Sequence, residues 1–156
     1  MATTDFEVRR LASSDVAATR RLNMAALPVP VAEHAYKDAI ASQMSWVAVQ
    51  RSSNALVGAI LVEPEGDGTA CIRTLAVDIR HRAKGVGSLL LQTAVDSCAS
   101  YARIYLHVQV ENADAIQVYK RAGFIVESHV PNYYRRVACT DCYIMALYGT
   151  AAYATE

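Results

Sequence analysis

Hydrophobic and polar residues follow two different periods along this chain. Seven segments show the alternation or the short apolar runs that are typical of strands. Four others carry apolar residues three or four positions apart, as on one face of a helix. The predicted strands are residues 6–11, 45–50, 55–64, 69–78, 103–110, 124–130 and 142–148. The predicted helices are residues 13–26, 33–43, 85–99 and 112–123.

Capping residues mark the ends of two of these helices. Ser13 or Ser14 is expected to cap the first helix, with Asp15 at the positive end of its dipole. Asn112 is expected to cap the last helix, and Gly123 to close it. Between the first two helices, residues 27–31 contain two prolines and are predicted to form an apolar loop.

The order of the predicted elements is β-α-α-β-β-β-α-β-α-β-β. Strands 69–78 and 103–110 flank one helix, so we expect them to run parallel. The hairpins make the other strands antiparallel. The sequence therefore predicts a single α/β domain over residues 1–148, with a mixed, mostly antiparallel sheet, a central parallel pair and flanking helices. Residues 149–156 are small and polar and are expected to form a loosely held tail.

Composition narrows the function. The chain has 156 residues, with 15 Lys and Arg balanced by 15 Asp and Glu. A nucleic-acid or membrane-surface binder usually carries a basic excess, so neither partner is expected. No apolar run is long enough to span a bilayer. The four cysteines are too few for a secreted disulfide scaffold, and the C-x-x-C of Cys139 and Cys142 is best explained by chance spacing. We expect an intracellular protein with reduced thiols.

A basic turn with two glycines, R-A-K-G-V-G at residues 82–87, lies between a predicted strand and a predicted helix. Free backbone amides and the helix dipole can hold an anion at such a point, and glycine lets it approach the backbone. The turn matches neither G-x-x-x-x-G-K-[ST] nor G-x-G-x-x-G. From these residues alone, a phosphate site and a plain helix start with solvated basic residues are about equally supported.

The same turn, R-x-x-G-x-G after a strand ending in L-A-V-D, resembles the coenzyme A pyrophosphate loop of the GNAT N-acetyltransferases. The order of elements matches that fold across nearly the whole chain. Ile79 and Ala83 depart from the pattern, where the family often has proline and glycine. The resemblance implies the GNAT fold, acetyl-CoA as co-substrate and no metal. It also implies the residues that bind the cofactor: Leu75, Val77, Arg82, Ala83, Lys84, Gly85, Val86, Gly87, Ser88, Asn112 and Tyr119.

Further motifs narrow the resemblance to one subgroup. Residues 112–124 are similar to the family segment N-x-x-A-x-x-x-Y-x-x-x-G-F. L-P-V-P, Y-K-D at residues 36–38, I-Y-L-H-V-Q and N-Y-Y-R-R together resemble the NatE-type (San) protein N-terminal acetyltransferases. The subgroup acetylates the α-amino group of protein N-termini, notably methionine followed by an apolar residue. The residues that would bind this peptide are Leu27, Pro28, Val29, Tyr133 and Tyr134.

The resemblance also implies where the protein acts. Its acceptor would be a peptide or nascent protein N-terminus, in the cytoplasm, with a nuclear location also open. A large auxiliary subunit of a ribosome-associated acetyltransferase complex is a further partner that the resemblance leaves open.

Two side chains are candidates for proton transfer. Strand alternation places Tyr105, His107 and Gln109 on one face. Taken alone, His107 is better explained as a buried core histidine, but Y-L-H-V-Q resembles the subgroup strand that carries its catalytic histidine, and this resemblance favours the base. Tyr119 is the candidate acid for the leaving thiolate by resemblance, and its alternative is a core aromatic three positions after Ile116.

Cys71 is the departure that bears most on activity. The subgroup normally has at this position a tyrosine that shares the role of base with the histidine. A thiol, with an ordinary pKa of about 8.5, is shorter and acts only weakly there. Either His107 works alone with ordered water, or the enzyme is slower, or the protein only binds coenzyme A. Val31 likewise replaces a tyrosine that often contacts the peptide.

Other functions are weighed against this one. A GNAT enzyme acting on lysine or a small amine is disfavoured by L-P-V-P and N-Y-Y-R-R, which would narrow the site around an extended peptide. A catalytically weak subunit that binds coenzyme A has Cys71 as its support. A nucleotide binder outside the GNAT family ranks last, because neither phosphate-loop pattern fits.

Overall fold

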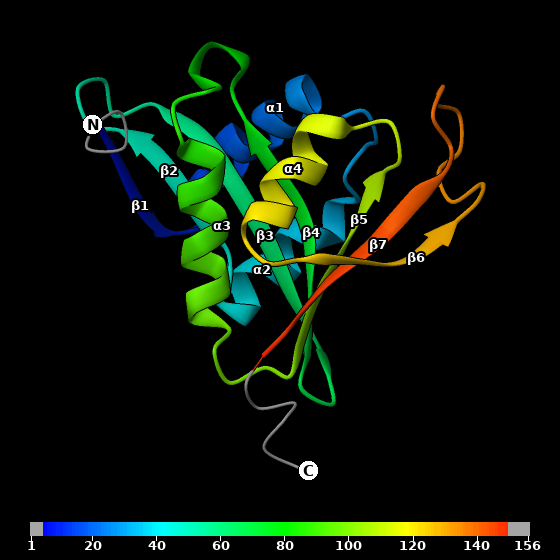
Figure 1. The fold of residues 1–156 in the computed structure, drawn as a ribbon. Helices are drawn as coiled ribbons and strands as arrows, with labels where there is room; N and C mark the ends of the chain where they lie inside the picture. The colour runs from blue at the N-terminus through cyan, green and yellow to red at the C-terminus, as the bar shows by residue number, and fades with distance from the viewer. Residues whose placement is uncertain (1–4, 150–156) are drawn as a thin grey trace. The chain divides into compact units, whose positions relative to one another are not determined.

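The computed structural model describes residues 5–149. The chain divides into two compact units. Unit 1 comprises Met1–Glu63 and Arg73–Ser97, and unit 2 comprises Pro64–Ile72 and Cys98–Glu156. The α-helices and strands, labelled in Figure 1, are β1 (Phe6–Arg10), α1 (Val16–Ala26), α2 (Glu33–Ser42), β2 (Trp46–Gln50), β3 (Leu56–Gly66), β4 (Thr69–Val77), α3 (Val86–Ser97), β5 (Arg103–Gln109), α4 (Ala113–Arg121), β6 (Ile125–Val130) and β7 (Cys142–Tyr148). Two short 3-10 helices, η2 (Ser13–Asp15) and η3 (Ile79–His81), precede α1 and α3.

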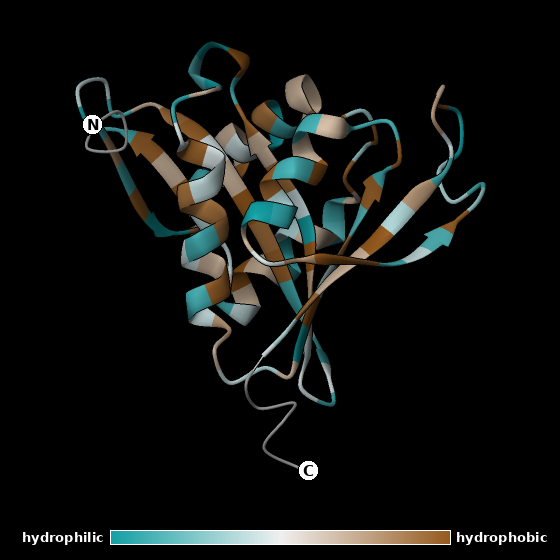
Figure 2. Ribbon diagram, in the orientation of Figure 1, coloured by the Kyte–Doolittle hydropathy of each residue, from teal (hydrophilic) through white to brown (hydrophobic). Residues whose placement is uncertain are grey.

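Unit 1 is built on antiparallel pairing. Phe6 of β1 lies opposite Gln50 of β2, and Trp46 of β2 lies opposite Ile60 of β3. In Figure 2 apolar and polar residues alternate around α3, as expected of a helix with one buried face. The hydrophobic core of this unit draws on its strands and on α1 and α2; it contains Leu11, Leu22, Tyr36, Ala39, Val47, Val49, Ala59, Leu61 and Ala76.

The start of α1 corrects one prediction. Neither Ser13 nor Ser14 caps the helix: both lie in η2, and α1 begins at Val16. The Asp15 carboxylate instead accepts a hydrogen bond from the Ala12 amide at 2.8 Å and two from the Arg9 guanidinium. These hydrogen bonds lower the pKa of Asp15, the one from the Arg9 side chain most. The Asp15 side chain makes no cap hydrogen bond to α1 either, so its carboxylate holds the residues before η2 and not the first turn of the helix.

Unit 2 contains the parallel pair. Thr69 to Ile72 of β4 pair in parallel with Arg103 to Leu106 of β5, with Cys71 opposite Tyr105. β5 pairs antiparallel with β7, and β7 with β6. Helix α4 is capped as predicted, because Asn112 Oδ1 accepts a hydrogen bond from the Ala115 amide. Gly123, with φ of +101°, follows the helix in a conformation that favours glycine.

The strand order is β1-β2-β3-β4-β5-β7-β6 in a seven-stranded mixed sheet. This order, the single parallel pair and the flanking helices confirm the predicted fold class. Over residues 5–149, no helix is both long and apolar enough to cross a membrane. Most of the predicted tail at residues 149–156 lies outside the described residues, and the boundary at residue 148 stays a prediction.

Candidate active site

The glycine loop, residues 82–87, follows η3 in unit 1 and includes the first two residues of α3. Ala83 and Gly85 have φ values of +62° and +82°. Because Gly85 is left-handed, α3 begins at Val86, one residue later than predicted, and its first helical bond runs from the Leu89 amide to the Gly85 carbonyl. The amides of the first helical turn have no partner within the helix. Left-handed residues just before a helix start form a concavity of amides that suits an anion such as a phosphate.

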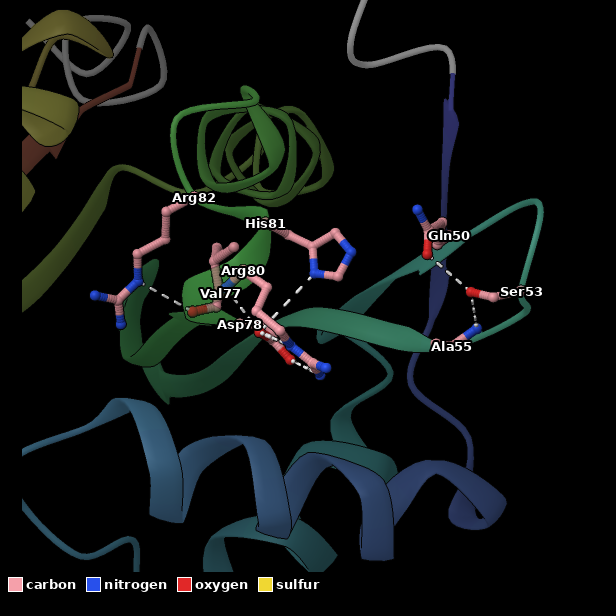
Figure 3. Close-up of polar contacts among 8 residues, drawn as sticks. All are labelled: Gln50, Ser53, Ala55, Val77, Asp78, Arg80, His81 and Arg82. Carbon is pink, nitrogen blue, oxygen red and sulfur yellow. Dashed lines mark hydrogen bonds and ion pairs between the residues drawn. The ribbon is translucent and has the colours of Figure 1, made fainter.

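Side chains before the loop hold its entrance in place. The Asp78 carboxylate accepts hydrogen bonds from the Arg80 amide and guanidinium, and the pKa of Asp78 is lowered to about 2, chiefly by the Arg80 side chain. Figure 3 shows Asp78 between Arg80 and His81, with Arg82 turned toward the Val77 carbonyl, to which its Nε donates at 3.3 Å. Lys84 is exposed. The loop therefore combines free amides with basic side chains, and it fits a pyrophosphate.

Gly58 of β3 packs against the start of α3, and no sequence pattern indicated this role. A Cβ at this position would lie 2.8 Å from Leu90 Cδ1 and 3.1 Å from Val86 Cγ1. The first turns of α3 therefore pack directly on the backbone of β3. In β4, Leu75 and Val77 are half-buried, whereas Ala76 between them is buried in the core. Ser88, in the first turn of α3, is exposed.

The predicted peptide-binding segment at residues 27–31 also belongs to unit 1. Leu27 and Val31 are partly buried against the hydrophobic core, Val29 is half-buried, and Pro28 is exposed. The packing of Val31 explains an apolar residue at this position. Tyr36 of the Y-K-D motif is buried and forms a hydrogen bond with the Asn23 amide group at 3.1 Å, so this tyrosine is a core residue.

His107 lies in unit 2, on the face of β5 that alternation predicts. Ile104, Leu106 and Val108 are buried, whereas the histidine face, which we define as Tyr105, His107 and Gln109, is half-buried. The His107 ring stacks on that of Tyr133, with centroids 4.3 Å apart and planes within 9°. The Tyr105 ring meets His107 edge-on at 5.8 Å. His107 is therefore no core histidine: its ring lies between two aromatic rings on a partly accessible surface.

Tyr133 and Tyr134 come from the β6–β7 loop, residues 131–141. Their rings meet at 83° with centroids 4.9 Å apart. Gln109 Nε2 donates to the Cys139 carbonyl at 2.8 Å and so ties this loop to the histidine face. Burial raises the pKa of Tyr134, so its hydroxyl stays protonated. The structure thus brings three predicted site residues together: His107, Tyr133 and Tyr134.

Tyr119 is buried in α4, where its ring lies 5.9 Å from that of Phe124. Burial raises the pKa of Tyr119 to about 12, so its phenol is neutral at physiological pH. Asn112, at the start of the same helix, is exposed and uses its side-chain oxygen for the cap. For a contact with a cofactor, Asn112 keeps its two amide hydrogens and the second lone pair of its oxygen.

Cys71 is buried, with 1% of its surface exposed, in the parallel pair opposite Tyr105. The Tyr105 hydroxyl donates a hydrogen bond to Glu65 Oε1 at 2.6 Å. Alternation placed Tyr105 beside His107, but its link to Glu65 was missed. Glu65 is 40 positions away, in a segment that was interpreted only as a turn, and no local pattern joins the two residues.

The cysteines and acidic residues form no metal centre within residues 5–149, because no group of three or more His, Cys, Asp or Glu residues there could hold an ion. Cys139 and Cys142 are free thiols. Cys139 is half-buried in the β6–β7 loop, and Cys142 is fully buried in β7.

Known proteins resemble this chain over most of its length. Residues 16–124 match the family model described as acetyltransferase (GNAT) family. N-alpha-acetyltransferase 50 of Danio rerio is 28% identical over 133 residues, which cover 81% of this chain and 78% of that protein. The probable N-acetyltransferase san of Drosophila melanogaster is 24% identical, over 93% and 82% of the two chains. Arabidopsis thaliana Naa50, solved with the bisubstrate analogue CoA-Ac-MVNAL, has a TM-score of 0.83 and 32% identity, and the match covers 92% of this chain and 98% of that one.

Proposed function

The chain belongs to the acetyltransferase (GNAT) family, and from this premise we propose that it acetylates the α-amino group of protein N-termini, with a preference for methionine followed by an apolar residue. It is an N-acetyltransferase with acetyl-CoA as co-substrate. The preference is supported by the bisubstrate analogue of the Naa50 neighbour, whose peptide begins with Met-Val.

The stack of His107 on Tyr133 carries the proposal. The base candidate and the aromatic pair of the β6–β7 loop lie on one surface of unit 2. Tyrosine rings and hydroxyls suit an extended peptide, since they offer apolar area and hydrogen bonds at small entropic cost. We propose that Tyr133 and Tyr134 hold the first residues of the acceptor beside His107. Leu27, Pro28 and Val29 of unit 1 are proposed as peptide-binding residues from the resemblance alone.

His107 acts as the general base in this proposal. An α-amino group has an ordinary pKa of about 8, against about 10.4 for lysine, so a substantial minority of N-termini is already neutral near pH 7. An imidazole titrates in the same range and can take up the remaining proton, directly or through one water. A lysine acceptor would need roughly two further pH units of assistance.

The cofactor would be held by the glycine loop and the strand end before it. Amides of Val86, Gly87 and Ser88, with Arg82 and Lys84, suit its pyrophosphate. When bound, acetyl-CoA supplies the acetyl thioester that the amine attacks directly. Tyr119 would assist the leaving sulfur as a hydrogen-bond donor. Its pKa of about 12 lies above the ordinary thiol pKa of about 8.5, so complete proton transfer is unfavourable.

The acceptor also suggests where the enzyme works. Protein N-termini emerge at the ribosome, so we place the enzyme in the cytoplasm, with a nuclear pool as a second location. As its partner we propose a larger subunit that anchors the enzyme to the ribosome.

A panel of peptides tests the proposal. Purified protein with acetyl-CoA should turn over Met-Val and Met-Leu peptides about 10- to 200-fold more efficiently than a serine-initiated peptide, the range that one apolar pocket supplies. Equal turnover of the serine peptide would contradict the preference. Binding of coenzyme A without turnover of any peptide would contradict the enzymatic proposal and support a non-catalytic subunit.

A further inference from the structure

Tyr105 lies directly opposite Cys71 in the sheet. The two residues are partners in the parallel pair of β4 and β5, so their side chains leave the sheet on the same face. By the resemblance described above, the residue expected at position 71 is a tyrosine beside the catalytic histidine, and this chain has Cys71 there. The structure therefore brings a tyrosine side chain to this place from the neighbouring strand.

Three contacts fix the Tyr105 side chain. Its hydroxyl donates to Glu65 Oε1 at 2.6 Å. The Arg103 guanidinium carbon lies over its ring, 4.4 Å from the ring centroid. Its ring edge lies against His107. Burial, Glu65 and Cys71 all raise the pKa of Tyr105, so the phenol keeps its proton.

The direction of these hydrogen bonds determines what the hydroxyl can do. Because its single proton is donated to Glu65, its oxygen lone pairs are available as acceptors. Cys71 lies directly opposite Tyr105 in the parallel pair, and it contributes to the raised pKa of this phenol. A bridging water needs an acceptor oxygen of fixed position near the base. The Tyr105 hydroxyl supplies such an oxygen, and His107 is the next residue on the same face of β5.

We propose that Tyr105, held by Glu65, takes over the role of the missing tyrosine at position 71 by orienting the water through which His107 deprotonates the amine. Tyr105 is thus a positioning residue: the proton passes from the amine to the water and from the water to His107, while Tyr105 and Glu65 keep their protonation states. This inference rests on the proposed function.

Three variants test the inference by kinetics with acetyl-CoA and a Met-Val peptide. Tyr105→Phe should lower kcat about 10- to 100-fold, the cost of a misplaced reactant, with KM for both substrates within about twofold. Glu65→Ala should act similarly, and the combined loss should be no larger than either single loss, because both changes release the same hydroxyl. Glu65→Gln keeps an acceptor and should retain most of the activity.

The substitution Cys71→Tyr separates positioning from a merely structural role. With a tyrosine restored at position 71, Tyr105→Phe should cost less than about threefold, since the water has a second holder. Tyr143→Phe is the control, because Tyr143 of β7 pairs with Val108, which lies on the opposite face of β5 from Tyr105 and His107. It should leave kcat unchanged.

Distinct outcomes overturn distinct claims. An active wild type with a Tyr105→Phe kcat within twofold of it would overturn this inference alone, as would an equal loss in the Cys71→Tyr background. A wild type inactive on every peptide would overturn the proposed function and this inference with it.

Discussion

The glycine loop and the histidine face perform their tasks with different parts of the chain. The loop offers backbone amides, and its shape depends on φ at Ala83 and Gly85. The histidine face offers side chains, whose positions depend on Tyr133, Glu65 and the residue at position 71. Because the loop binds through backbone amides, it keeps its shape with alanine at position 83, where the family often has glycine. A site made of side chains needs a compensating group when one is replaced.

The largest effect is expected from removing the base. His107→Ala should lower kcat about 10²- to 10⁴-fold and leave coenzyme A affinity unchanged, because the loop that binds the cofactor is intact. Steady-state kinetics and calorimetric titration with coenzyme A measure the two quantities. His34→Ala, on the exposed surface of α2, is the control and should match wild type. A His107→Ala enzyme within twofold of wild type would remove His107 from the mechanism.

Distorting the backbone of the glycine loop should instead weaken the binding of coenzyme A. Gly85→Val places a β-branched residue at φ of +82°, at a cost of about 1–3 kcal/mol. We expect an affinity for coenzyme A that is about 5- to 150-fold weaker, measured by titration. Gly66→Val is the matched control, since Gly66 has φ of +86° and its Cβ would meet no atom within 4 Å. Both variants should lose thermal stability. Equal coenzyme A affinities of Gly85→Val and Gly66→Val would show that the loop does not bind the cofactor.

Relieving the backbone strain at Ala83 should have a smaller effect, and on stability. Alanine at φ of +62° is strained where glycine is not, so Ala83→Gly should raise the free energy of unfolding by about 1 kcal/mol. For a domain of this size the expected rise in Tm is about 2–4 °C, measured by calorimetry. Ala122→Gly is the control at a negative φ of −82° and should lower Tm. A fall of Tm in both variants would contradict strain at Ala83.

The smallest effect concerns acid stability at the entrance of the loop. The folded-state pKa of Asp78 is about 2, below its ordinary value of 3.8, so the carboxylate stabilises the fold above about pH 4. This contribution is lost as the pH falls through about 2. The difference in free energy of unfolding between wild type and Asp78→Asn should therefore shrink between pH 5 and pH 2. Asp38→Asn, on the exposed surface of α2, should show no such trend. A constant difference for Asp78→Asn would contradict the Arg80 contact.

Most of the fold could be predicted from local patterns. Alternation in β5 gave the correct face for His107, and Gly123 marked the end of α4. The prediction of a serine cap on α1 was wrong, because Ser13 to Asp15 form η2 and the Asp15 side chain is held by Arg9 of the preceding strand. Gly58 and Glu65 were missed for a related reason. Their roles arise from contacts with Leu90 and Tyr105, which lie 32 and 40 positions further along the chain.

The position of the transferred acetyl group tests the central claim most directly. A peptide that begins with Met-Val and contains one internal lysine would be incubated with the protein and acetyl-CoA, and tandem mass spectrometry would locate the acetyl group. An N-terminally blocked copy of the peptide serves as the control. We predict acetylation of the α-amino group and none of the blocked copy. Acetylation of the lysine in both peptides would contradict the account.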